Sequence, residues 1–158
     1  MKKLYLSFAL LLTGWLLAAP QLMAQPQLPN FNFKDLAGKT VRGHEIAFTK
    51  YLTIIYFDPT CEHCLATTQE MLKNIKKFSA TKIVWISFAE KEQIADFKKT
   101  YFPKNKNMIF LHDKDMKIFD SFGDLYDTPT FIVYNKNKTL IKSITTPATI
   151  DEVISIYK

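Results

Sequence analysis

Glycine is scarce in this sequence. The 158 residues include four glycines, and they are not grouped as in a dinucleotide-binding or phosphate-binding loop. The Gly-x-Ser-x-Gly motif of serine hydrolases is also missing. The sequence therefore argues against a bound nucleotide and against a serine nucleophile, and we expect no cofactor.

Charge of one sign is not concentrated in any part of the chain. The formal net charge is +6, and the lysines are spread among acidic residues. This pattern is typical of a solvated surface and predicts no nucleic-acid partner. Asp113, Asp115, Asp120 and Asp124 occur close together, but they do not follow the order of a calcium-binding EF-hand loop. We interpret them as a polar helix start and surface.

The N-terminus has the pattern of a secretory signal. Lys2 and Lys3 precede an apolar run from Leu4 to Ala19, which is shorter than the roughly 20 residues of a membrane-spanning helix, and small residues follow it. We predict a signal peptide at residues 1–24 and one domain at residues 25–158. An uncleaved anchor is the alternative, and it would be the only membrane attachment. The pattern predicts secretion across the inner membrane into the periplasm.

Short apolar runs alternate with helical patterns along the predicted domain. The runs at 52–57 and 83–88 are apolar at nearly every position, which predicts strands that are buried on both faces of a sheet. Further strands are expected at 108–111, 131–134 and 140–144. The last two should form a terminal hairpin, and residues 30–41 are expected to be an irregular entry with a turn.

Apolar residues at helical spacing fill the intervals between these strands. They share one face within residues 65–78, 94–101 and 116–122. Thr149, with Glu152 three residues later, predicts the start of a last helix. This order of elements predicts an α/β sandwich whose sheet is parallel in its core and antiparallel at one edge.

The chain has two cysteines, Cys61 and Cys64, and two residues separate them. They follow a predicted strand where the next helix begins. Helix amides and the helix dipole stabilise an anion at this point, so we expect Cys61 to ionise readily. Cys64 would be less exposed and close enough to form a disulfide with Cys61. Such a pair can exchange disulfides, with Cys61 as nucleophile and Cys64 as the resolving thiol.

A pair of cysteines has three other common uses in proteins. Structural zinc takes four ligands, and His44, His63 and His112 do not show a zinc-finger spacing. A structural disulfide across two residues would constrain the unfolded chain little. Two thiolates and one histidine can hold Cu(I), which makes a copper-binding metallochaperone an alternative function. Disulfide exchange is favoured over all three, and no metal site is predicted.

The sequence resembles the thioredoxin-fold disulfide oxidoreductases, and among them the exported TlpA/ResA-like branch. The resemblance rests on Tyr56-Phe57-Asp58-Pro59-Thr60-Cys61-Glu62-His63-Cys64 after a hydrophobic strand, and on Asp127-Thr128-Pro129-Thr130-Phe131-Ile132-Val133. It implies a thioredoxin-like three-layer α/β/α sandwich with a mixed sheet and a cis-proline loop. Pro129 matches that proline, and Thr128 would present its backbone to an extended substrate segment.

Two departures from the family pattern affect the expected chemistry. Ile55 stands where thioredoxins have a buried acid, so Glu62, or less readily Asp58, is the candidate proton acceptor for the buried thiol. Peroxiredoxins need a proline and a threonine at set positions before the reactive cysteine, and Ile54 and Asp58 stand there before Cys61. We therefore do not expect a peroxiredoxin.

The residues between the cysteines tune the direction of electron flow. Glu62 would raise the pKa of Cys61 and favour a reductant, whereas a protonated His63 would lower it, as in a disulfide-forming oxidant of DsbA type. The resemblance favours a reductase of protein disulfides, with the oxidant as the alternative. The expected partners are a protein that carries a disulfide or a dithiol, and a membrane-embedded thiol carrier as electron source.

Overall fold

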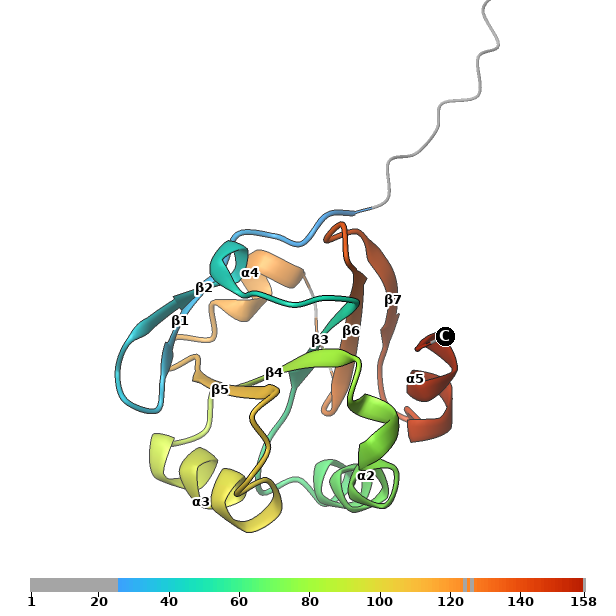
Figure 1. Cartoon of the computed structure of the whole chain (residues 1–158). Helices are drawn as coiled ribbons and strands as arrows, with labels where there is room; N and C mark the ends of the chain where they lie inside the picture. Colours follow the sequence, from blue (N-terminus) through green and yellow to red (C-terminus); the bar gives the residue numbers. More distant parts are fainter. Residues whose placement is uncertain (1–25, 124, 126, 158) are drawn as a thin grey trace, which may run out of the picture.

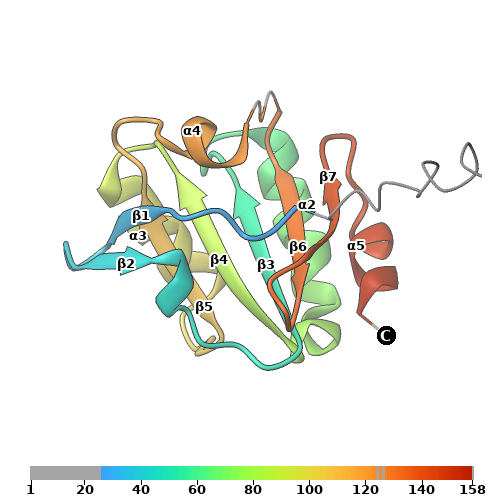
Figure 2. The same ribbon diagram turned by 90° about the horizontal axis from the view of Figure 1, so that it is seen from above.

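The computed structural model describes residues 26–123, 125 and 127–157, so the predicted signal peptide lies outside the described residues. Seven strands form one sheet in the order β2-β1-β5-β4-β3-β6-β7 (Figures 1 and 2). Their bounds are β1 Asn32–Asp35, β2 Thr40–Arg42, β3 Tyr51–Tyr56, β4 Thr81–Ser87, β5 Met108–His112, β6 Thr130–Asn135 and β7 Leu140–Ile144.

Helices cover both faces of this sheet. Their bounds are α2 Glu62–Lys73, α3 Lys91–Tyr101, α4 Ile118–Phe122 and α5 Ile150–Ile156, with short 3-10 turns at Gly43–Glu45 and Ile75–Phe78. Figure 1 shows α2, α3 and α5 on one side of the sheet and α4 on the other. None of the described helices combines the length and the apolar character that a membrane-spanning helix needs.

The sheet is mixed, as the order of elements predicted. Strand β3 runs parallel to β4, and β4 runs parallel to β5. Strand β6 is antiparallel to β3 and forms a hairpin with β7. The carboxyl ends of β3, β4 and β5 therefore lie at one end of the sheet, where α/β proteins place their sites.

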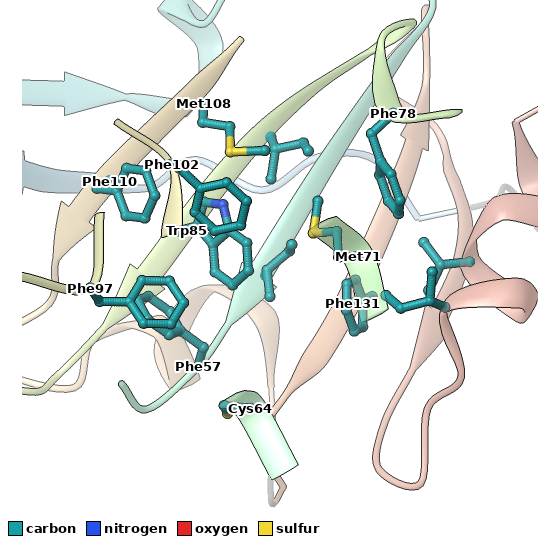
Figure 3. Close-up of a cluster of buried hydrophobic side chains, with 14 of the residues drawn as sticks. Phe57, Cys64, Met71, Phe78, Trp85, Phe97, Phe102, Met108, Phe110 and Phe131 are labelled. Atoms are coloured by element: carbon teal, nitrogen blue, oxygen red, sulfur yellow. The ribbon is translucent and has the colours of Figure 1, made fainter. Parts of the chain in front are cut away.

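Alternate residues of the central strands point to opposite faces. Ile55 and Trp85 belong to the core beneath α2, α3 and α5, with several aromatic side chains (Figure 3). Ile54 and Val84 belong to a second core, together with Ile118 of α4. The central strands are thus buried on both faces, which explains why their sequences are apolar without interruption.

Residues 30–41 include strands rather than the irregular entry that the sequence indicated. Strand β1 is antiparallel both to β2 and to β5. In the turn, the Asp35 carboxylate accepts hydrogen bonds from the amides of Ala37 and Lys39, and Gly38 has a φ of 86°. These strands are short, so pairing with the edge of β5, rather than local propensity, decides their conformation.

The helix expected at 116–122 begins later than predicted. Strand β5 is followed by a turn, and α4 starts at Ile118. The Asp113 carboxylate accepts hydrogen bonds from the amides of Lys117 and Ile118, at 2.9 and 2.8 Å, and so fixes the helix start. Met116 precedes the helix and has a φ of 52°. At the last helix, Thr149 Oγ1 accepts from the Glu152 amide at 3.2 Å, which confirms the predicted start of α5.

The first described residues pair with the turn between β6 and β7. The Leu140 amide donates to the Pro26 carbonyl at 2.8 Å, and the Leu28 amide donates to the Lys138 carbonyl at 2.8 Å. This turn follows the end of β6 that pairs with the start of β3. The chain therefore enters the fold at the end of the sheet away from the cysteines.

Candidate active site

The two cysteines lie where β3 leads into α2. Cys61 is the N-cap residue of α2, and Cys64 lies in its first turn. Both are free thiols. Cys61 is partly exposed, whereas Cys64 is 1% exposed and lies at one end of the buried cluster (Figure 3). The structure thus places one accessible and one buried thiol side by side on a helix start.

A tight turn before the helix holds this pair. The Asp58 carboxylate accepts hydrogen bonds from the amide and the hydroxyl of Thr60, at 2.8 and 2.7 Å. The Cys61 amide donates to the Asp58 carbonyl at 3.2 Å, and the Asp58 amide donates to Cys64 Sγ at 3.4 Å. An aspartate whose side chain binds the backbone two residues later is typical of such turns.

The pKa of Cys61 lies below its usual value. Partial burial acts in the opposite direction, but hydrogen bonds to its sulfur outweigh it. They come from the Cys64 amide, the side chains of Thr128 and Cys64, and the His63 amide. The helix start thus stabilises the Cys61 thiolate, the form that attacks disulfides.

The pKa of Cys64 is shifted the other way. Burial raises it to about 12, against the hydrogen bond from the Asp58 amide and the side chain of Thr128, and the charge of a Cys61 thiolate raises it further. The two thiols therefore differ strongly in how readily they ionise. Cys61 is suited to the first attack, and Cys64 acts only after something removes its proton.

A second loop closes the site from the side of β6. The Thr128–Pro129 peptide bond is cis. The Cys61 thiol donates to the Thr128 carbonyl, with 3.8 Å between sulfur and oxygen. The Pro129 carbonyl accepts a hydrogen bond from the Thr146 hydroxyl at 3.2 Å, so the loop is also tied to the chain after β7. The structure brings the two sequence segments that carried the resemblance into contact.

The residues predicted to tune the pKa of Cys61, or to accept the proton of Cys64, lie at or just before the start of α2. Glu62 and His63 are exposed in the first turn of α2, and Ile55 is fully buried in β3. Asp58 reaches Cys64 through its backbone amide. The roles predicted for Glu62 and His63 stay predictions. Among the described residues, no three His, Cys, Asp or Glu side chains are grouped so that they could hold a metal ion.

A groove of about 560 Å³ opens beside Cys61. Cys61, Asp58, His63 and Thr128 line it together with residues for which the sequence predicted no role in the site. The additional lining residues include Tyr56, Phe88, Met116, Phe119 and Asp127. Phe88 was expected to end a strand and Met116 to lie in a helix, so the sequence carried no signal that both would border the thiol.

Comparison with protein families gives a match over most of the chain. The model of the AhpC/TSA family matches residues 24–143, which include both cysteines and Pro129. No curated protein sequence matches the chain.

Solved structures show the same fold. Peroxidoxin BcpB from Mycobacterium tuberculosis superposes with a TM-score of 0.71 at 13% identity, covering 85% of this chain and 95% of that one. MTB dsbF, in mixed oxidised and reduced forms, gives 0.68 at 16% identity, with 85% and 100% covered. A secreted Mycobacterium tuberculosis disulfide oxidoreductase homologous to E. coli DsbE gives 0.64 at 22% identity, with 79% and 92% covered. These matches show a thioredoxin-like fold.

Proposed function

Because the chain belongs to the AhpC/TSA family of thioredoxin-fold redox enzymes, we propose that its Cys61–Cys64 pair catalyses thiol-disulfide exchange on protein substrates. The observation that carries this proposal is the difference between the two thiols. The partly exposed Cys61 has a lowered pKa, and the buried Cys64 beside it has a pKa raised to about 12. Cys61 is thus suited to attack a substrate disulfide, and Cys64 to resolve the mixed disulfide afterwards.

In the reducing direction, the Cys61 thiolate attacks one sulfur of a substrate disulfide. That S–S bond breaks, a mixed disulfide forms with Cys61, and the other substrate sulfur leaves as a thiolate. Cys64 then loses its proton and attacks Cys61 Sγ, which forms the Cys61–Cys64 disulfide and releases the second substrate thiolate. The substrate gains two electrons and takes up two protons, and the enzyme is oxidised by the same amount.

The raised pKa of Cys64 means that the second step needs a proton acceptor close to the sulfur. Glu62 is our candidate because it lies in the same helical turn, and Asp58 is the second because its backbone contacts Cys64. Neutralising each carboxylate separately distinguishes them, since loss of the acceptor slows resolution of the mixed disulfide without slowing its formation.

We propose further that the protein is an exported reductase of the TlpA/ResA-like kind. The N-terminal signal pattern supports export to the periplasm, and the Cys-x-x-Cys and Thr-Pro-Thr segments support the branch. A reductase in that compartment needs a dithiol to restore Cys61 and Cys64, and a membrane-embedded thiol carrier is the class of donor that fits. The redox potential of the Cys61–Cys64 disulfide decides the direction of electron flow. A potential of about −250 mV or lower indicates a reductase, and one near −120 mV indicates an oxidant.

Trapping of mixed disulfides tests the proposed chemistry. A Cys64→Ala variant should accumulate a covalent complex between Cys61 and a disulfide-bearing protein, visible on non-reducing gels and dispersed by dithiothreitol. Cys61→Ala is the matched control and should trap nothing. If Cys64→Ala also traps nothing, while folded, the proposal is wrong. Tight Cu(I) binding without any disulfide exchange would instead support the metallochaperone.

Peroxide reduction is the second candidate function, because the matching family and one superposing structure carry peroxiredoxin-type names. In that reaction Cys61 would take one oxygen from the peroxide, and Cys64 would displace water from the resulting sulfenic acid. The positions that peroxiredoxins fill with proline and threonine hold Ile54, buried in β3, and Asp58. We therefore expect the rate constant with hydrogen peroxide to be far below that with a disulfide.

A further inference from the structure

Two large apolar side chains are exposed beside the reactive thiol. Phe88 is 40% exposed and Met116 is 51% exposed, and both line the groove that contains Cys61. The third large apolar side chain with comparable exposure among the described residues is Ile141, at 41%, and it does not line this groove. Single exposed apolar residues are common, whereas apolar side chains gathered along one groove are typical of a surface that binds a partner or ligand.

The two loops that carry Phe88 and Met116 are tied together by buried groups. The Asp113 amide donates to the Ser87 carbonyl at 2.8 Å, which joins the loop after β5 to the end of β4. Ser87 is fully buried, and its hydroxyl accepts from the Ala89 amide at 3.1 Å. The positions of the two exposed side chains are therefore determined by the fold rather than by free loops.

Met116 also has an unusual backbone conformation. Its φ of 52° is uncommon for a residue with a side chain. The Met116 amide donates to the Asp113 carbonyl at 3.1 Å, and the Asp113 carboxylate holds the two amides that follow Met116 in the helix start. Such conformations persist where surrounding contacts determine them, and they are enriched at binding sites.

Aromatic rings continue the apolar surface into the groove. The ring of Tyr56 lies 6.1 Å from that of Phe88 and 5.7 Å from that of Phe119, between centroids. All three line the groove with Met116. One wall of the groove is thus apolar from Phe88 to Phe119, and a large apolar side chain of a substrate would lose its contact with water there.

The charges of the groove are opposite in sign to that of the whole chain. Asp58 and Asp127 line the groove, and no lysine or arginine is among its described lining residues, although the net charge is +6. Lys76, Lys104 and Lys106 border a hollow near the starts of β4 and β5, at the other end of the sheet, and Lys114 and Lys117 border a separate hollow near the end of β5. The groove therefore attracts a cationic segment and repels an acidic one.

We propose that the groove selects an extended substrate segment in which a large apolar residue and a lysine or arginine flank the disulfide cysteine. Phe88 and Met116 contact the apolar side chain, and Asp127 faces the cation. This inference rests on the proposed function, because it assigns a substrate class to the same Cys61 thiol.

Three cysteine peptides test the selection, each linked through a disulfide to the chromophore thionitrobenzoate. One has leucine and arginine beside the cysteine, the second has leucine and glutamate, and the third has serine on both sides. Cys61 attacks the peptide sulfur, the peptide–chromophore bond breaks, and thionitrobenzoate leaves as a coloured thiolate. The second-order rate constants are compared within each enzyme variant, so that changes in thiol reactivity cancel in the ratio.

For the wild-type protein we expect the leucine-arginine peptide to react about tenfold faster than the serine peptide. Phe88→Ser and Met116→Gln should each lower this ratio by about threefold or more. Ile141→Gln, at a similarly exposed apolar residue outside the groove, should leave the ratio unchanged. Asp127→Asn should reduce the preference for arginine over glutamate by about threefold, and added salt should do the same.

The outcomes separate the two proposals. If all three peptides react at equal rates with the wild type, the substrate class is wrong and disulfide exchange stands. If none reacts, and the small disulfide dithionitrobenzoate does not react either, the proposed function itself fails. If Ile141→Gln lowered the ratio of the leucine-arginine to the serine peptide rate constants as much as Met116→Gln does, the assignment of the groove would be overturned. Urea unfolding of each variant verifies that it is folded.

Discussion

Cys61 Sγ lies 3.8 Å from the carbonyl oxygen of Thr128, across 67 residues of sequence. The contact joins the start of α2 to the loop that leads into β6. The carbonyl accepts from the protonated thiol, whereas the side chain of Thr128 stabilises the Cys61 thiolate. The loop expected to face the substrate is therefore part of what makes the thiol reactive.

Alkylation should distinguish the two cysteines by pH. The thiolate is the reactive form, and the pKa of Cys61 is below the usual 9.0, so modification by iodoacetamide should rise with pH to a plateau whose midpoint lies below 9.0. Cys64, with a pKa of about 12, should stay unmodified in the folded protein over this range. Mass spectrometry of digested samples assigns each site. A Cys61 midpoint at 9.0 or above would contradict the structure.

Thr128→Val should make Cys61 less reactive. Valine keeps the shape of threonine but removes the hydroxyl, so the thiolate loses one stabilising hydrogen bond, the pKa of Cys61 rises, and alkylation at neutral pH should slow by about fivefold. The control is Thr67→Val, since Thr67 lies in α2, the helix that begins after Cys61, but is not one of the residues that hydrogen-bond the Cys61 sulfur. Equal rates in the two variants would show that the Thr128 side chain does not act on the thiol.

Stability at alkaline pH should depend on Cys64. Its pKa is about 12 in the folded protein and near 9.0 when unfolded, so the unfolded chain loses this proton first. The contribution of the buried thiol to stability is complete below pH 9 and is lost progressively as the pH rises toward 12.

Two variants isolate this effect from the opposite one of Cys61. In a Cys61→Ala protein, the free energy of unfolding should fall as the pH rises from about 9 to 11. In the double variant that also carries Cys64→Ala, the free energy of unfolding should fall less steeply with pH. Tyr134 and Tyr157, with pKa values raised to about 12, should account for part of the fall that is left. The free energies of unfolding are measured by urea titration at each pH. If they fall in parallel in the single and the double variant, Cys64 is exposed in solution.

Asp113→Ala should destabilise the protein by about 2–3 kcal/mol, because it leaves the amides of Lys117 and Ile118 without the carboxylate that caps them. Asp115→Ala is the matched control, since Asp115 is exposed and pairs with Lys117 at 3.6 Å on the surface. That control should change the free energy of unfolding by less than about 0.5 kcal/mol. Similar losses in both variants would mean that capping is not the cause.

The sequence predicted the parallel core and the position of the thiols because these features depend on local pattern. Uninterrupted apolar runs mark strands that are buried on both faces, and the boundary after 52–57 places Cys61 at a helix start. The helix cap at Thr149 could be predicted for the same reason.

Other features depend on contacts between distant segments. The β1–β2 hairpin pairs with β5, and Met116 takes its conformation from the turn and helix start that Asp113 holds. The sequence predicts that Asp113 belongs to a polar helix start and surface; its side chain does cap the start of α4, but it is buried there. The exposure of Phe88 follows from where β4 ends, so the groove could not be read from local spacing.

The pairing of Pro26 and Leu28 with the turn between β6 and β7 has a practical consequence. A bead, an electrode or a fusion protein joined ahead of Pro26 would be linked at the end of the sheet farthest from Cys61. Protein immobilised in this way would present its thiols outward to a large folded substrate. An attachment in the loop around Thr128 would instead block the thiols.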